Sequence, residues 1–254
     1  MRTEPFDADE LSLDAFLGGR LEIAQPRAGY RAGIDPVLLA AAVPAKAGET
    51  LLDLGCGAGV AALCAGARIA GLRLAGLEVQ PAYAALAREN AARNGIAMEV
   101  VTGDVASMPE ALRQRQFDHV IANPPWFDRS AGTRAADAGR EEALGEALPL
   151  AGWVAAALRR CRPGGHVCVI HRAERLADLL AAMHGSVEVL PLIPRRGRAA
   201  RLVLVRTRKG GRAPLRLCDG WLLHDGARHE GDRENLTPST ASVLRDAAPL
   251  PLCR

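Results

Sequence analysis

Short apolar runs alternate with longer amphipathic stretches along most of this chain. Apolar runs that end at Gly, Asp or Asn are typical of buried strands, whereas apolar residues at helical spacing predict helices that cover a sheet. Strands that alternate with helices favour a parallel sheet covered on both faces. The sequence predicts strands at 50–54, 72–78, 97–104, 117–123, 166–170, 187–193 and 200–207, and helices at 37–43, 60–70, 81–94, 148–161, 172–184 and 238–245.

The last two of these strands, 187–193 and 200–207, have no helical segment between them. Strands joined by a short loop pair antiparallel, because a parallel pair needs a long crossover connection. We therefore expect a hairpin at one side of the sheet. The predicted fold class is α/β, with a mostly parallel seven-stranded sheet, an antiparallel edge strand and helices on both faces.

The two ends of the chain carry weaker signals than its middle. Near the N-terminus, Asp35 is a candidate N-cap and Pro36 a candidate first residue of a short buried helix. Near the C-terminus, short strands are expected around Leu215 and Trp221. We expect one domain over 1–254, made of an N-terminal cap segment at 1–44, a core at 45–208 and a C-terminal extension at 209–254.

The composition is that of a protein with a packed core, since 49% of the 254 residues are hydrophobic. The longest apolar runs, such as 37–43, fall far short of the ~20 residues that cross a bilayer, and the acidic start lacks a signal-peptide core. We therefore expect a cytoplasmic protein without membrane contact. The six cysteines show no C-x-x-C spacing, so we expect reduced structural thiols, no disulfide and no metal site.

Charge is distributed unevenly, although the net charge of the whole chain is only +3. Residues 1–150 carry 14 Lys and Arg against 20 Asp and Glu, whereas residues 151–254 carry 18 against 9. The stretch 191–216 holds nine basic residues and no acidic one. Such a patch suits a polyanion such as a nucleic acid, and it is also compatible with an ordinary solvated surface.

The first candidates for chemistry follow the predicted strand 50–54. Asp53 ends an apolar run, and Gly55, Gly57 and Gly59 follow at alternate positions. Glycines allow a sharp turn and a close approach of a ligand to the backbone. Backbone N–H groups at the next helix suit an electron-rich ligand, and the carboxylate accepts hydrogen bonds from cationic or hydroxyl groups. The spacing differs from the G-x-G-x-x-G of dinucleotide-binding turns, so a nicotinamide dehydrogenase is disfavoured.

Other polar residues are predicted to lie near this turn. Glu78 ends the second core strand, where nucleotide-binding α/β folds bind ribose hydroxyls. Asp104 ends the third strand and would either lie beside the adenine of a nucleoside or act only as an N-cap. Tyr30 and Arg31, in a polar segment ahead of the first helix, form either a lid over the site or a structural clamp.

The segment Asn123-Pro124-Pro125-Trp126 directly follows a predicted strand, at the edge where open α/β sheets bind ligands. Two prolines remove two backbone donors, so the turn is stiff and rich in acceptors. The Asn123 oxygen and the Pro124 carbonyl can accept both hydrogens of a planar amine, and Trp126 offers a face for a flat ring. The lone pair of such an amine is delocalised, which makes the amine a poor nucleophile. Its attack on an activated methyl group would therefore depend on positioning and electrostatics. A loop beside the site is expected at 127–146.

Taken in order, D-L-G-C-G-A-G, Glu78, the pair Gly103-Asp104 and N-P-P-W resemble the class I S-adenosylmethionine-dependent methyltransferases that modify exocyclic or amide nitrogens. The segments Q-P-R-A-G-Y-R-A-G-I-D-P and A-R-L-V-L-V-R are similar, more specifically, to bacterial adenine-N6-methyltransferases that act on valine tRNA. The resemblance implies a Rossmann-like fold, S-adenosyl-L-methionine as cofactor and RNA, most specifically tRNA, as partner. We also expect a monomer or weak dimer.

The resemblance further implies a role for each candidate residue. The target base would be held by 123–126, where Trp126 replaces the commoner Tyr or Phe and keeps a stacking face. A base in a duplex or a stacked loop has to be flipped out to reach it. The cofactor would be bound by Asp53, Gly55, Gly57, Gly59, Glu78, Asp104, Tyr30 and Arg31, and the substrate RNA by Arg195, Arg196, Arg198 and Arg201.

Three other functions are compatible with the same motifs. The N-P-P turn also resembles that of enzymes that methylate a glutamine amide in release factors or a guanine N2 in ribosomal RNA. A cofactor-binding RNA adaptor without turnover would need only the basic stretch at 191–216 for its activity. That stretch favours nucleic acid over protein as the acceptor.

Overall fold

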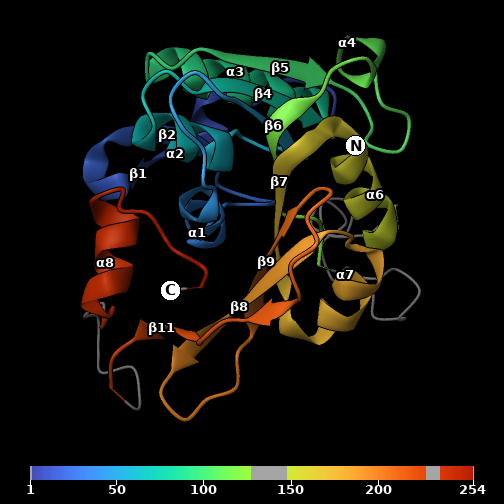
Figure 1. Cartoon of the computed structure of the whole chain (residues 1–254). Helices are drawn as coiled ribbons and strands as arrows, with labels where there is room; N and C mark the ends of the chain where they lie inside the picture. The colour runs from blue at the N-terminus through green and yellow to red at the C-terminus, as the bar shows by residue number, and fades with distance from the viewer. Residues whose placement is uncertain (1, 127–147, 227–234, 254) are drawn as a thin grey trace, which may run out of the picture.

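The computed structural model describes residues 2–126, 148–226 and 235–253, so the expected loop at 127–146 lies outside the described residues. A twisted sheet runs through the middle of the molecule (Figure 1). Within the described ranges it has nine strands in the order β10-β8-β9-β7-β6-β3-β4-β5, with β11 pairing to β8 off this path. These strands are β3 (Thr50–Leu54), β4 (Arg73–Glu78), β5 (Met98–Thr102), β6 (Phe117–Ala122), β7 (Cys161–Arg172), β8 (Ser186–Arg195), β9 (Leu202–Arg208), β10 (Arg216–Leu217) and β11 (Trp221–His224).

The helices that cover the sheet are short. In the described part of the chain, none of them has the length and apolar character that a membrane span requires. They are α1 (Asp35–Ala42), α2 (Val60–Arg68), α3 (Pro81–Arg93), α4 (Glu110–Arg113), α6 (Leu150–Arg160), α7 (Leu176–Ala182) and α8 (Pro238–Arg245).

Strand β3 shows how the sheet divides the core into two layers. Successive side chains of a strand point to opposite faces. Leu51 packs in a cluster with α1 and α2, whereas Leu52 and Leu54 pack in a second cluster with α6 and α7. Both faces of the sheet are therefore buried, as parallel strands require. The prediction of an α/β fold with a mostly parallel sheet and helices on both faces is confirmed.

The number of strands and the place of the antiparallel strand differ from the prediction. The expected β8–β9 hairpin is present, but β9 pairs antiparallel with both β7 and β8 and so lies inside the sheet. The crossover through α7 leaves a gap between β7 and β8, and β9 fills it because both neighbours offer unpaired backbone groups there. The short strands β10 and β11 then extend the edge by pairing parallel to β8.

Helix α1 differs from its predicted capping pattern. Ile34 is the N-cap, and Asp35 and Pro36 are the first and second helical residues. The prediction of Asp35 as N-cap is therefore wrong, because the Ile34 carbonyl already accepts the amide of Leu38 at 3.0 Å. Asp35 instead lies partly buried in the first turn, where burial raises its pKa to about 6.

The N-terminal hairpin, β1 (Leu11–Phe16) with β2 (Leu21–Pro26), packs against α3. The fully buried side chain of Asn90 joins them, because its Oδ1 accepts the amide of Ala24 at 2.8 Å and its Nδ2 donates to the Ala24 carbonyl at 3.0 Å. Helix α8 lies beside this hairpin (Figure 1), and a Cβ on Gly18 would lie 2.6 Å from the carbonyl oxygen of Arg245. The C-terminal helix α8 therefore packs against the N-terminal hairpin.

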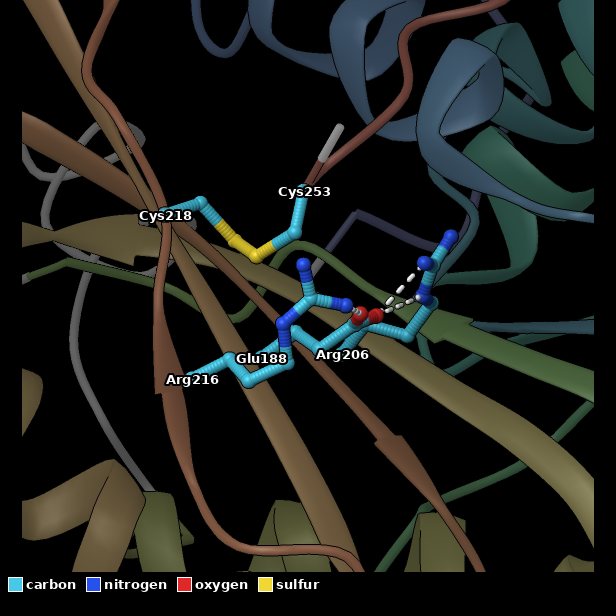
Figure 2. The surroundings of a disulfide bond; sticks show 5 residues. All are labelled: Glu188, Arg206, Arg216, Cys218 and Cys253. Carbon is cyan, nitrogen blue, oxygen red and sulfur yellow. Dashed lines mark hydrogen bonds and ion pairs between the residues drawn. A yellow bond between two sulfur atoms is a disulfide. The ribbon is translucent and has the colours of Figure 1, made fainter.

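Cys218 and Cys253 form a disulfide (Figure 2), so the expectation of reduced thiols throughout is wrong for this pair. The two cysteines are 35 residues apart, and no short spacing motif marks them. They meet because two backbone hydrogen bonds position their segments. The amide of Cys218 donates to the Val189 carbonyl at the sheet edge, and the amide of Leu250 donates to the Ala41 carbonyl. The four other cysteines are free and buried.

Candidate active site

The turn after β3 has the strand, turn and helix arrangement that its glycines predict. Gly57 and Gly59 have φ values of 54° and 86°, and α2 begins directly after Gly59. The amide of Gly55 donates to the Leu77 carbonyl at 2.8 Å, which holds the turn against the end of β4. A Cβ on Gly55 would lie only 2.8 Å from the indole of Trp153, so this position has room for glycine alone.

Asp53 lies beneath this turn with 3% of its surface exposed. Its Oδ2 is buried and has no hydrogen-bond partner among the residues that the structure describes. Burial, together with the negative charge of Glu78, raises the pKa of this carboxyl group to about 8. A buried acceptor without a partner costs about 1–3 kcal/mol. A ligand that donates a hydrogen bond here would remove that cost.

Glu78 connects the end of β4 to the glycine turn. Its Oε2 accepts the amide of Gly57 at 2.9 Å, and its Oε1 accepts the amide of Gln80 at 2.8 Å. Only 6% of the residue is exposed, and burial raises the pKa of the carboxyl group despite these hydrogen bonds. The structure therefore brings Glu78 and the glycine turn together, as the sequence predicts.

Tyr30 covers the same turn from the N-terminal segment. Its ring lies 3.8 Å from the place that a Cβ on Gly57 would take, and its carbonyl accepts the hydroxyl of Tyr83 at 3.1 Å. Burial raises the pKa of the Tyr30 phenol, with further contributions from the charges of Asp35 and Asp53. Tyr30 therefore stays neutral, and its ring lies over the glycine turn while its backbone is tied to α3 through Tyr83.

Arg31 and Asp104 make local contacts instead. The guanidinium of Arg31 pairs with Asp14 at 2.6 Å and donates to the Pro26 carbonyl at 2.7 Å, so Arg31 clamps the N-terminal hairpin. These contacts do not join it to the glycine turn. Asp104 is exposed at the end of β5, where its Oδ1 accepts the amide of Ala106 at 2.8 Å.

The pairing of β3 with β6 places the N-P-P-W segment beside the glycine turn. Leu54 and Ala122 are partners in these adjacent parallel strands. The residues that follow them, Gly55 and Asn123, therefore leave the sheet side by side. Two motifs that are far apart in the sequence thus share one site at the carboxyl ends of the strands, where open α/β sheets bind ligands.

The N-P-P-W segment presents a buried acceptor and an aromatic face. Asn123 Oδ1 is buried and has no hydrogen-bond partner within the described ranges. The half-buried ring of Trp126 has its centroid 5.6 Å from the guanidinium carbon of Arg172, which is a cation–π contact. This arrangement can accept hydrogen bonds from a flat amine and stack against its ring.

Sequence reasoning missed two residues that flank these motifs. Trp153 on α6 packs against Gly55, and His171 at the end of β7 is fully buried against the backbone of Pro125. Burial lowers the pKa of His171 to about 4, so its imidazole is neutral at pH 7. An indole on an amphipathic helix and a histidine in an apolar strand are ordinary core residues, so neither stands out in the sequence.

The basic hairpin, defined here as residues 195–201 from the end of β8 to the start of β9, lies next to this site. The amide of Ala173 donates to the Arg201 carbonyl at 2.9 Å, which places the hairpin beside the end of β7 and therefore beside Arg172. Of the four arginines predicted to contact RNA, Arg196, Arg198 and Arg201 are exposed, whereas Arg195 is half-buried and donates to the carbonyls of Asp225 and Gly226.

Other basic residues of the stretch 191–216 have structural partners. Arg206 forms an ion pair with Glu188 at 2.5 Å, with both side chains largely buried. The ammonium group of Lys209 donates to the carbonyls of Leu158 and Cys161, each at 2.8 Å. Part of the positive charge that suggests a polyanion therefore stabilises the fold instead.

Comparison with known proteins shows the family. The model of the methyltransferase small domain family matches residues 33–191. The chain is 34% identical over 176 residues to a tRNA1(Val) (adenine(37)-N6)-methyltransferase of Porphyromonas gingivalis, which covers 65% of this chain and 68% of that protein. It is 29% identical over 202 residues to the protein of the same name in Dickeya chrysanthemi, covering 76% of this chain and 78% of that one.

Solved structures show the same fold. A structure titled as a predicted O-methyltransferase from Agrobacterium tumefaciens matches with a TM-score of 0.69 and 26% identity, over 85% of this chain and 98% of that one. The 16S rRNA N2 G1207 methyltransferase of Thermus thermophilus matches with a TM-score of 0.56 and 19% identity, over 78% and 50% of the two chains. The chain belongs to the methyltransferase small domain family and is an S-adenosylmethionine-dependent methyltransferase with the Rossmann-like class I fold.

Proposed function

We propose that this methyltransferase modifies the exocyclic N6 of an adenine in tRNA, as the names of its relatives state for those proteins. The observation that carries the proposal is the buried Oδ1 of Asn123, which has no partner among the described residues and lies in a segment that adjoins the Gly55 turn. An exocyclic amine offers two hydrogens. These two hydrogens match the Asn123 oxygen and the carbonyl of Pro124. The next residue, Pro125, has no backbone N–H, so the turn offers acceptors there and no donor.

For the cofactor, we propose that Asp53 and the turn 55–59 hold the methionine part and that Glu78 holds the ribose. The fit rests on the buried Oδ2 of Asp53, which lacks a partner among the described residues and suits a cationic amino group. The Glu78 carboxylate already faces the turn and keeps lone pairs for hydroxyl groups. Tyr30 would cover the cofactor, and Asp104 would reach its adenine.

The cofactor supplies a methyl group on a sulfonium centre that is already activated for transfer, so the protein has to prepare the amine. The lone pair of the adenine amine is delocalised into the ring. Hydrogen bonds to Asn123 and Pro124 favour a tetrahedral nitrogen and so return the lone pair to it. Stacking on Trp126 fixes the plane of the flipped base, which aligns the nitrogen with the methyl group.

A competition assay with labelled S-adenosylmethionine tests the class of acceptor. We expect incorporation of label into tRNA from a strain that lacks the enzyme, and none into release factor or ribosomal RNA under the same conditions. Label in release factor would support glutamine methylation instead. RNA binding without any incorporation would support the adaptor function.

Charge reversal in the basic hairpin is expected to weaken RNA binding. In the triple variant Arg196→Glu, Arg198→Glu, Arg201→Glu, the affinity for tRNA should fall and its dependence on salt should flatten, because each lost phosphate contact reduces the number of released counterions. Titrations at several salt concentrations measure both effects. Arg113→Glu, an exposed change on α4, is the control and should leave the salt slope intact. An unchanged slope in the triple variant would show that the hairpin is only a solvated surface.

A further inference from the structure

His171 lies behind the N-P-P-W segment without contributing to the acceptors described above. Strand β7 pairs with β6 so that Val169 is opposite Ala122. Two residues further along, His171 is therefore level with the first proline of the segment. Its side chain has 0% of its surface exposed, and its ring lies against the backbone of Pro125.

The hydrogen bonding of this imidazole is incomplete. Neither Nδ1 nor Nε2 of His171 completes a hydrogen bond with any described residue. Burial is the main cause of its lowered pKa, and the positive charges of Arg175 and Arg172 add to it. A neutral imidazole carries one N–H group, and the backbone carbonyls of Pro125 and Arg172 are acceptors close to it, with the larger effect on the pKa coming from Pro125.

We propose that His171 is a positioning residue for the N-P-P-W segment. Its N–H donates to the Pro125 carbonyl when the target base occupies the segment, and this bond fixes the direction in which the Asn123 oxygen and the Pro124 carbonyl point. Hydrogen bonds of this kind are often long in a ligand-free enzyme and shorten in the complex with substrate. The inference rests on the proposed function, because it assigns His171 to the binding of the amine acceptor.

The geometry explains why a small movement would matter. The two acceptors have to contact both hydrogens of one nitrogen, so a shift of the turn removes both contacts together. A displacement of about 1 Å in a site of this kind costs about 100-fold in rate. In the proposed arrangement His171 acts on the base only through the N-P-P-W segment, so its loss should change the rate of transfer and leave cofactor binding alone.

Single-turnover methyl transfer with His171→Leu and His171→Gln tests this role. In His171→Leu we expect a rate about 10- to 100-fold below wild type, with unchanged affinity for S-adenosylmethionine and an unchanged melting temperature. His171→Gln keeps an N–H donor and should recover most of the rate. His119→Leu is the matched control, because His119 is also buried, with 3% exposed, but it pairs with Glu49 at 2.8 Å. It should lower the melting temperature without a selective loss of rate.

Two results would overturn the inference. One is a wild-type rate in His171→Leu. The other is a parallel loss of rate, cofactor affinity and melting temperature without recovery in His171→Gln, which would indicate a structural role. Should the wild-type protein methylate a different acceptor, the proposed function fails, and the same comparison on that acceptor still decides the role of His171.

Discussion

Asn123→Ala is expected to slow methyl transfer to tRNA by about 100- to 1000-fold, the range for removal of one preorganised polar group in an active site. The buried Oδ1 of Asn123 has no partner among the described residues, so the change removes no hydrogen bond of that atom within this part of the chain. Its effect should therefore be confined to the step in which the amine becomes nucleophilic. Single-turnover assays together with cofactor titrations separate this effect from binding.

Asn94→Ala provides the control for Asn123→Ala. Asn94 uses its amide for hydrogen bonds to the backbone of Glu22 and Asn90, outside the site. Its loss should reduce stability and leave the transfer rate unchanged. Wild-type activity in Asn123→Ala, or an equal loss in both variants, would contradict the assignment of the amine to the N-P-P-W segment.

Asp53→Ala is expected to weaken the binding of S-adenosylmethionine by about 10- to 100-fold, which corresponds to the loss of one hydrogen bond to a charged group. Isothermal titration measures this directly. Asp118→Ala is a suitable control, because Asp118 accepts from the amide and hydroxyl of Thr50 at the opposite end of β3. If wild type and Asp53→Ala bound S-adenosylmethionine with equal affinity, Asp53 would not be a cofactor-binding residue.

The raised pKa of Asp53 predicts that the stability of the cofactor-free protein depends on pH. Because its pKa is about 8 in the folded protein and about 3.9 in an unfolded chain, the folded state holds the proton more tightly. The free energy of unfolding therefore falls as the pH rises from about 4 to about 8. Asp53→Asn should remove this decline and be more stable than wild type above pH 8. Denaturant titrations at several pH values measure the free energy of unfolding of both proteins. If the free energy changed with pH in the same way in wild type and in Asp53→Asn, the carboxyl group would not be buried in solution.

Much of the fold and most of the candidate site could be predicted because they depend on local patterns. The apolar run before Asp53 and the three glycines specify a strand and a turn through backbone conformation alone. The N-P-P-W segment is equally local, since two prolines define a stiff turn wherever they follow a strand. That the two motifs meet follows from the rule that parallel strands end at one edge of a sheet.

The features that sequence reasoning missed depend on distant contacts. The placement of β9 between β7 and β8 is decided by a gap in the sheet, and the Cys218–Cys253 disulfide by the packing of the C-terminal segment. For Arg31 the sequence leaves a lid and a structural clamp open, and the ion pair with Asp14 of the hairpin favours the clamp. His171 becomes notable only when the position of Pro125 is known.

If the glycine turn and the N-P-P-W segment together methylate an adenine amine in tRNA, the product is N6-methyladenosine. Mass spectrometry of nucleosides tests this activity most directly, using tRNA from a strain that lacks the enzyme, incubated with the protein and S-adenosylmethionine. We expect N6-methyladenosine to appear with the wild-type protein and to be lost with Asn123→Ala. Methylated guanosine in place of N6-methyladenosine, or no methylated nucleoside at all, would contradict the proposed function.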